Sequence, residues 1–359
     1  MLNLGHLVNT VQKNCHISDA RHAGDFTLCI FLLKMREFYR WEHDIPFAHD
    51  LPRSEVGSWM QEREHMWSDL ETCAFEPLPL ENRRLDPFDA EAINRELVPH
   101  GYVYSGGYGR FYKPHFFLGA LLNKQRRDGY TIYVSSCEYA RDLEAPPAML
   151  QGRTIYVRQE SVRRFLWEKV EEWRWNRKNE AMERALACYA FDLDVAGALE
   201  RMTQNETEAM ILHELGEGMV GEQLGEDWHT LIESLARSKA EIMVRAVRDI
   251  LADCLSTLPG LLAAQNVASL HFYFANFGGM RRHLFPEAIA AYQRWVAEQN
   301  PAVLHALADE GRRRWLTVAR AMLDLHKTKG ADAAPAIENL LEPAPDTTPC
   351  CNAKTASNP

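Results

Sequence analysis

Two nearly identical hexapeptides, Gly129-Tyr-Thr-Ile-Tyr-Val134 and Gly152-Arg-Thr-Ile-Tyr-Val157, decide which part of this chain forms a sheet. Threonine, isoleucine, tyrosine and valine favour extended backbone, and a glycine opens each run. We therefore predict strands at about 130–135 and 153–158. Because nothing else recurs at this spacing, the near-repeat is interpreted as two strands of one sheet and not as a tandem module. Both strands belong to a small α/β insertion at 99–158.

The rest of this insertion is predicted from its glycines, tyrosines and prolines. Tyrosine and glycine cluster directly before Pro114, and we predict a third strand at about 102–105. Pro114 is compatible with the first turn of a helix, which we expect to end near Asp128.

Helical patterns lie on both sides of the insertion. Ser18 is available as an N-cap for one long helix to about Asp44, and further helices are expected at about 54–73 and 86–97. We predict a mainly α protein, a multi-helix bundle with a small α/β insertion. The predicted organisation is an N-terminal helical segment at 1–98, the insertion at 99–158, a C-terminal helical bundle at 159–330 and a disordered tail at 331–359.

The composition excludes several classes of function. The chain has 359 residues and a net charge of −10, which on average repels nucleic acid. It lacks the run of about 20 apolar residues that crosses a bilayer, and it lacks a secretory signal, so we expect a cytoplasmic protein. The eight cysteines include no Cys-x-x-Cys pair, which argues against a zinc ribbon. The expected partner is a small-molecule substrate or another protein, and the oligomeric state is left open.

The motif His213-Glu214-Leu-Gly-Glu217 is the sharpest chemical signal, in a helix expected to begin near Asn205. A spacing of four places His213 and Glu217 on one helical face, where both could bind one cation. Glu214 lies about 100° away, which is the relation of the general base in a His-Glu-x-x-His zinc site. Glutamate replaces the second histidine of that motif. A standard metalloprotease is therefore in doubt, although carboxylate is an acceptable ligand of zinc, iron or manganese, with zinc slightly favoured.

Three residues of the N-terminal segment are candidates to complete this metal site. His22 shares a helical face with Asp25, and Glu62 and His65 have the Glu-x-x-His spacing of carboxylate-bridged di-iron proteins. The alternative interpretation is that these groups are helix caps and surface ion pairs.

Other residues near the motif allow two interpretations. Gly216, Gly218 and Gly221 weaken a helix, so they indicate either a metal site pressed against a neighbouring helix or a plain tight crossing. Glu206 lies on the stripe of His213 and is either a ligand or an acidic residue in the first turn of a helix capped by Asn205 and Glu208.

Three segments carry a resemblance to a known family: Asn14-Cys-His-Ile-Ser-Asp-Ala-Arg-His-Ala-Gly-Asp25, Gly109-Arg-Phe-Tyr-Lys-Pro-His115 and the His213 motif. Together they resemble an uncharacterised bacterial protein family of unknown function, and the resemblance implies no activity. From the residues themselves we predict a metal-binding protein, specifically a metal-dependent hydrolase with His213, Glu217, His22, Glu62 and His65 as candidate ligands and Glu214 as catalytic base. The alternatives are a non-catalytic helical scaffold or protein-interaction protein, and a carboxylate-bridged di-iron oxidoreductase.

Overall fold

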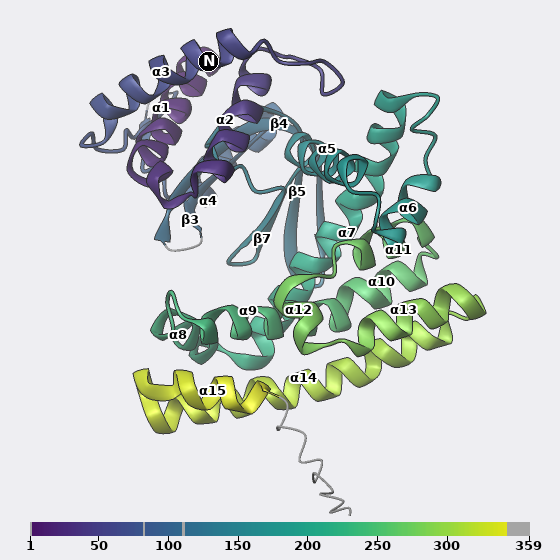
Figure 1. Ribbon diagram of the computed structural model, residues 1–359. Coiled ribbons are helices and arrows are strands. Elements are labelled where there is room, and N and C mark those ends of the chain that lie inside the picture. Colours follow the sequence, from purple (N-terminus) through teal and green to yellow (C-terminus); the bar gives the residue numbers. More distant parts are fainter. Residues whose placement is uncertain (1, 82, 110–111, 343–359) are drawn as a thin grey trace, which may run out of the picture.

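The computed structural model describes residues 2–81, 83–109 and 112–342, and the predicted mainly α fold is confirmed (Figure 1). Helices precede and follow a central sheet. They are α1 (Leu4–His22), η1 (Ala23–Asp25), α2 (Leu28–Glu42), α3 (Arg53–Leu70), α4 (Ala90–Leu97), η2 (Val98–His100), α5 (Gln159–Trp175), α6 (Glu180–Ala187), α7 (Val195–Leu224), α8 (Glu226–Ser234), α9 (Lys239–Ala252), η4 (Asp253–Thr257), α10 (Leu258–Ala263), α11 (Val267–Ala275), α12 (Gly279–Leu284), α13 (Glu287–Glu298), α14 (Ala302–Lys329), η5 (Gly330–Ala333) and α15 (Ala334–Leu341).

The central sheet has the strand order β3-β4-β5-β7-β6. Its strands are β3 (Tyr102–Tyr108), β4 (Pro114–Arg127), β5 (Tyr130–Arg141), β6 (Ala148–Gln151) and β7 (Thr154–Arg158). Neighbours are antiparallel except β5 and β7, which are parallel and carry the two hexapeptides. Ile132 pairs with Ile155 and Tyr133 with Tyr156, so the two copies lie side by side in register. The prediction of two strands in one sheet is confirmed. A separate hairpin joins β1 (Leu78–Leu80) and β2 (Arg83–Leu85).

The predicted helix from Pro114 to Asp128 is wrong, because this segment is strand β4. It pairs with β3 on one edge and β5 on the other. Phe116 and Leu118 pack in the core with α1 and α4, whereas Phe117 packs with the opposite face of the sheet. This alternation is that of a strand, and a proline is tolerated at the first strand position as readily as at the first turn of a helix.

The predicted single helix from Ser18 to Asp44 is also wrong, because two helices occupy this region. Helix α1 begins earlier, at Leu4, and ends at His22, and extended backbone at Phe26 and Thr27 precedes α2. Ser18 is no N-cap. Its hydroxyl is buried and donates to the carbonyl oxygen of Pro114, which fastens α1 to strand β4.

Helix α7 is longer than the sequence predicts. It begins at Val195 and not near Asn205, because the carboxylate of Asp194 accepts from the N–H of Gly197 and caps it there. At the other end of the chain, α15 occupies the start of the segment predicted as a disordered tail, and residues 343–359 of that prediction lie outside the described residues.

Helix α7 joins two hydrophobic cores. Its first part, including Leu199 and Met202, packs with α5 and with Ile132 of the sheet, while Val220 and Leu224 pack among helices α8 to α15. Figure 1 shows helices α1, α2 and α3 above the sheet and helices α8 to α15 as a layer below it, with α5, α6 and α7 between them. No described helix is both long enough and apolar enough to span a membrane.

Candidate metal centre

Helices α7 and α9 approach each other closely because glycine stands at their crossing. A β-carbon at Gly216 would collide with the carbonyl oxygen of Ala252, and one at Gly218 would collide with the ring of Tyr130. Gly221 has open space where its β-carbon would lie. Two of the three glycines therefore serve close approach, and the approach at Gly216 brings the His213 motif against the end of α9.

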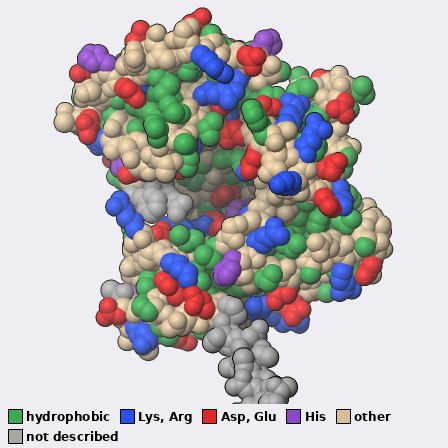
Figure 2. All heavy atoms as spheres, viewed as in Figure 1, with side chains coloured by type: hydrophobic (Ala, Val, Ile, Leu, Met, Phe, Trp, Pro, Cys, Tyr) green, Lys and Arg blue, Asp and Glu red, His purple; other side chains and the backbone are tan. Residues whose placement is uncertain are grey.

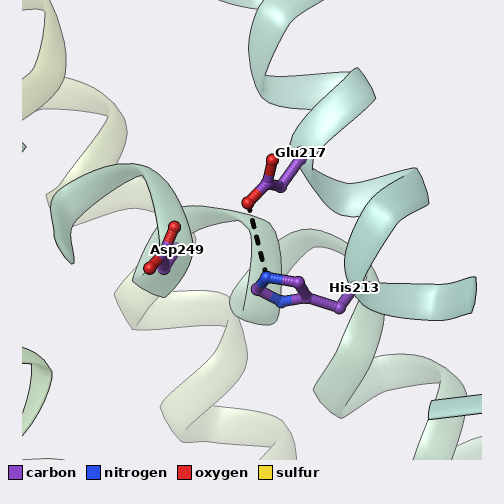
Figure 3. Close-up of side chains that lie close together, drawn as sticks. All are labelled: His213, Glu217 and Asp249. Atoms are coloured by element: carbon purple, nitrogen blue, oxygen red, sulfur yellow. Dashed lines mark ion pairs between the residues drawn. The ribbon is translucent and has the colours of Figure 1, made fainter. Parts of the chain in front are cut away.

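His213, Glu217 and Asp249 point toward one another at this crossing (Figure 3). One ligand atom from each lies within 4.8 Å of the other two. His213 Nε2 lies 3.5 Å from Glu217 Oε1. The side chains of His213, Glu217 and Asp249 are 28%, 16% and 29% exposed, so the group is sheltered but open to solvent. A nitrogen and two carboxylates at such spacing form a donor set that suits zinc, iron or manganese.

Asp253 fixes the orientation of the His213 ring. It follows the last residue of α9 and begins the π-helical turn η4, a local irregularity that is frequent at functional sites. One carboxylate oxygen accepts from His213 Nδ1 at 2.8 Å and from the Thr257 hydroxyl at 3.0 Å. The other accepts from the Tyr273 hydroxyl and from Arg281 Nη1, both at 3.0 Å. Because Nδ1 is bound to Asp253, Nε2 is the ring nitrogen left for Glu217 or a cation.

This arrangement governs the charges of Asp253 and His213. Burial raises the pKa of Asp253, but His213, Arg281 and Tyr273 outweigh it and hold that pKa below its usual range. Burial lowers the pKa of His213, yet Asp253 and Glu217 together raise it well above its ordinary value. The imidazole therefore carries a proton at neutral pH when no cation competes for it.

Arg248 provides the positive charge nearest to the two carboxylate ligands. Its Nη2 lies 2.7 Å from Glu217 Oε1 and 3.0 Å from Asp249 Oδ1. Burial raises the pKa of Glu217, but Arg248 and His213 reverse the effect and lower it overall. Glu217 is thus ionised, and Arg248 lies within ion-pair distance of both Glu217 and Asp249.

Glu214, the predicted catalytic base, lies beside this group and is not one of its three members. Its carboxyl accepts a hydrogen bond from the backbone N–H of Leu150 on β6, so it faces the edge of the sheet. Burial and the neighbouring Glu217 raise the pKa of Glu214 to about 7. Such a carboxyl exchanges its proton near neutral pH, as a general base must.

One face of the molecule has a hollow. Figure 2 shows this hollow between the N-terminal helices and the C-terminal helices, with acidic and histidine side chains visible inside it. The partial exposure of His213 and Asp249 is the local sign that solvent reaches the centre.

The structure does not bring the N-terminal candidates to His213. His22 lies at the end of α1, where its Nδ1 is 3.2 Å from Asp25 Oδ2, and Glu62 and His65 are exposed on α3. Within residues 2–81, 83–109 and 112–342, the one group of three or more potential ligands is that of His213, Glu217 and Asp249.

Sequence reasoning missed Asp249 and Asp253, which occupy the positions expected for the N-terminal candidates. Their signal was present, since two acids one helical turn apart at the end of α9 mirror the spacing of His213 and Glu217 on α7. The motif fixes only its own helix, however, and no local pattern reveals which helix crosses it.

Glu206 is not one of the three clustered ligands, and it does not lie in the first turn of α7. It lies in the interior of α7, is 4% exposed, and accepts a hydrogen bond from the Ser269 hydroxyl at 2.6 Å. Burial raises the pKa of Glu206 to about 7, because the hydroxyl only partly opposes the effect.

Comparison with known proteins gives a family without an assigned activity. Residues 163–344 match the model described as "Family of unknown function (DUF6866) C-terminal domain", and residues 6–158 match the model of the corresponding N-terminal domain. Neither a curated protein nor a solved structure matches the chain. The predicted resemblance to a family of unknown function is confirmed, and it adds no function to the geometry.

Proposed function

The chain belongs to the DUF6866 family of unknown function, and we propose that it binds a divalent metal cation through His213, Glu217 and Asp249. The observation that carries this proposal is the bond from His213 Nδ1 to Asp253. Histidine ligands of metals usually donate their other ring N–H to a carboxylate, which fixes the tautomer and the ring orientation. Asp253 does this for His213, while Glu217 and Asp249 converge on the side of the free nitrogen.

The charge balance around the centre supports a divalent ion. Four carboxylates face two guanidinium groups, which leaves two negative charges when all carboxyls are ionised and the imidazole is neutral. These groups are Glu214, Glu217, Asp249 and Asp253, with Arg248 and Arg281. Without a metal, two protons supply the missing charge, because the pKa of His213 is raised and that of Glu214 is about 7. A divalent cation would replace these two protons.

A hydrolytic reaction is the chemistry we propose for the loaded centre. A zinc ion lowers the pKa of bound water toward neutrality, and this is the chemistry the group supplies when bound. Glu214, one residue after His213 on α7, is the carboxyl that would accept the proton of the water. Asp253 holds the imidazole in place. Arg248 pairs with Glu217 and Asp249, and Arg281 pairs with Asp253.

The geometry gives less support to the two alternatives. A di-iron oxidoreductase needs several carboxylates and histidines from separate helices around two ions, and Glu62 and His65 stand exposed on α3, apart from the group around His213. A non-catalytic scaffold accounts for the ion pairs, but it gives no reason for Asp253 to orient a partly exposed histidine.

Metal analysis of the purified full-length chain tests the proposal. Protein prepared without a histidine tag should contain close to one equivalent of zinc, iron or manganese by elemental analysis, or take up one equivalent in a titration. His213→Ala should abolish the uptake. Asp253→Asn should weaken it by about 10-fold to 100-fold, because it removes the group that orients the ligand and not a ligand itself.

The matched control is His305→Ala. His305 and Asp309 have the same one-turn spacing on α14 but are exposed, so this variant should bind metal as the unchanged protein does. Metal-free protein that takes up no ion, with stability unchanged by a chelator, would reject the proposal and support the scaffold function. Equal loss of metal in the two histidine variants would also reject it.

A further inference from the structure

A second cluster of charges lines a cavity far along the chain from the His213 motif. The cavity has a volume of about 180 Å³ and lies between α2, the loop after it, the end of β5 and the first turns of α5. We call it the arginine cavity, because Arg40, Arg141 and Arg164 line it. Trp41 and Phe47 also belong to its walls. The volume is smaller than the cavities of drug-sized ligands and suits a small group.

Each of the three arginines has a buried nitrogen without a hydrogen-bond partner among the described residues. These atoms are Arg40 Nη2, Arg141 Nη2 and Arg164 Nε. The three residues are 3%, 1% and 7% exposed, so bulk water does not solvate the guanidinium groups. An unpaired donor of a buried charged group is costly, and these three donors all belong to residues that line one cavity.

The protein itself uses the other nitrogens of these guanidinium groups. Arg40 Nη1 donates to the carbonyl oxygen of Pro46 at 2.6 Å, and Arg164 Nη2 donates to that of Ala145 at 2.6 Å. These bonds hold the guanidinium groups in place around the cavity. The forks of Arg40 and Arg164 are therefore each positioned by at least one nitrogen, while another nitrogen of each has no partner among the described residues.

Carboxylates also line the arginine cavity, and two of them already accept hydrogen bonds from the protein. Glu37 accepts from Arg40 Nε at 3.2 Å, and Glu160 accepts from the backbone N–H of Glu138 at 2.6 Å. The third acid, Asp44, is exposed in the loop after α2. Burial and the charge of Arg164 lower the pKa of Arg141 to about 10, so the two guanidinium groups repel each other across the cavity.

We propose that the arginine cavity binds the oxyanion group, phosphate or carboxylate, of a small ligand. Its oxygens would accept from the three unpartnered nitrogens, and its negative charge would relieve the repulsion between Arg141 and Arg164. Arg141 also lies over the ring of Trp41, 5.3 Å from the ring centroid, so occupancy would change the surroundings of that tryptophan. This proposal does not depend on metal binding at His213.

The test is a titration of the full chain with potassium phosphate and, separately, potassium acetate at constant ionic strength set with KCl. Tryptophan fluorescence, calorimetry and the thermal unfolding midpoint are followed. We expect saturable binding and a rise in the midpoint. Tighter binding of phosphate identifies a phosphate-bearing ligand, and tighter binding of acetate identifies a carboxylate. Trp41→Phe should remove the fluorescence response and leave the calorimetric binding in place.

Arg164→Gln should weaken binding about tenfold or more, because it removes a charged donor. Arg163→Gln is the matched control, since Arg163 is the preceding residue of α5 but pairs with Glu200 outside the cavity. If Arg164→Gln does not fold by circular dichroism, Arg164→Lys keeps the charge, loses the Nε donor and should still bind more weakly. The proposal is overturned if neither anion gives a saturable signal beyond that of KCl, or if the variants at 163 and 164 weaken binding equally.

Discussion

The candidate metal centre and the arginine cavity are both built from sheltered charged groups, but they differ in which hydrogen-bonding groups stay unused. Around His213, four carboxylates meet two guanidinium groups, and acceptors converge on the free side of the ring. In the arginine cavity three guanidinium groups retain unused donors, while Glu37 pairs with Arg40 and Glu160 accepts from a backbone N–H. We therefore propose a cation for the first region and an anion for the second.

The difference teaches that burial alone does not decide what a charged group does. Asp253 and Glu206 are both almost completely buried, yet the pKa of Asp253 is lowered and that of Glu206 is raised. Asp253 receives four hydrogen bonds, two of them from potentially cationic groups, whereas Glu206 receives one from a serine. The partners set the sign of the effect.

Asp253→Ala is the change with the largest expected effect on this contrast. It leaves His213 and Arg281 without their shared carboxylate, so we expect the free energy of unfolding to fall by about 3 kcal/mol. Urea unfolding measures the loss. Asp249→Ala, which removes a partly exposed partner of Arg248, should lower it by less than about 1 kcal/mol. Similar losses in the two variants would contradict the central role given to Asp253.

Glu206→Gln tests the buried acid whose pKa is raised. The pKa of Glu206 is raised from an ordinary 4.5 to about 7. Between these two pH values the carboxyl keeps its proton in the folded state and has lost it in the unfolded state. The stability that this proton confers is fully present below pH 4.5 and is lost as the pH rises through 7. The variant should gain stability relative to the unchanged protein between pH 5 and pH 8, by about 2 kcal/mol.

Urea unfolding at pH 5 and pH 8 measures this gain. Glu208→Gln is the control on the same helix, because Glu208 is partly exposed and pairs with Arg127 at 2.6 Å. A pH dependence that is the same in both variants would show that Glu206 is not the group responsible.

The glycines of α7 test the helix crossing on which the metal centre depends. Gly216→Ala should destabilise the protein by about 1 to 2 kcal/mol and weaken metal uptake, because its β-carbon meets the backbone of Ala252. Gly221→Ala meets open space and should stabilise the helix by about 0.5 to 1 kcal/mol. Thermal unfolding distinguishes a loss of stability from a gain. A gain of stability in both variants would contradict the close approach of α7 and α9 at Gly216.

The smallest effect is expected at the exposed counterpart of the His213 motif. His305→Ala on α14 should change the free energy of unfolding by a few tenths of a kcal/mol, because exposed pairs one helical turn apart contribute little. His213→Ala in metal-free protein should cost more, since it leaves Asp253 with one cationic partner fewer. Both losses of unfolding free energy are measured in the same denaturant series. Equal losses would show that His213 contributes no more to stability than the exposed His305.

Local patterns predicted the elements that have a period or a repeat of their own. The paired hexapeptides gave β5 and β7 correctly because β-favouring residues and a leading glycine agree with the observed pairing. Strand β4 could not be predicted this way, because a proline at its start is compatible with a helix as well as with a strand. Its pairing with β3 and β5 on its two edges makes it a strand. The break after His22 escaped notice because the helix formers from Leu28 onward suggested one continuous helix.

For the candidate site, the sequence identified the two donors that share a helix and missed those across the crossing. His213 and Glu217 follow from a spacing of four, which is a property of one element. Asp249 and Asp253 reach them only through the contact at Gly216 and the π-helical turn after Ala252. The sequence could not predict the arginine cavity for the same reason, because α2, β5 and α5 each contribute one arginine.

The docking of α1 on the sheet has a consequence for synthesis on the ribosome. The Gln12 side chain bonds both backbone groups of Arg141, and Asp19 accepts from the N–H of Leu143, a residue 124 positions later. At ordinary translation rates those partners emerge on the order of 10 s after the helix. During that interval the apolar face of α1 around Leu7 and Val11 has no sheet to cover it, which makes the nascent chain a natural client for a holding chaperone.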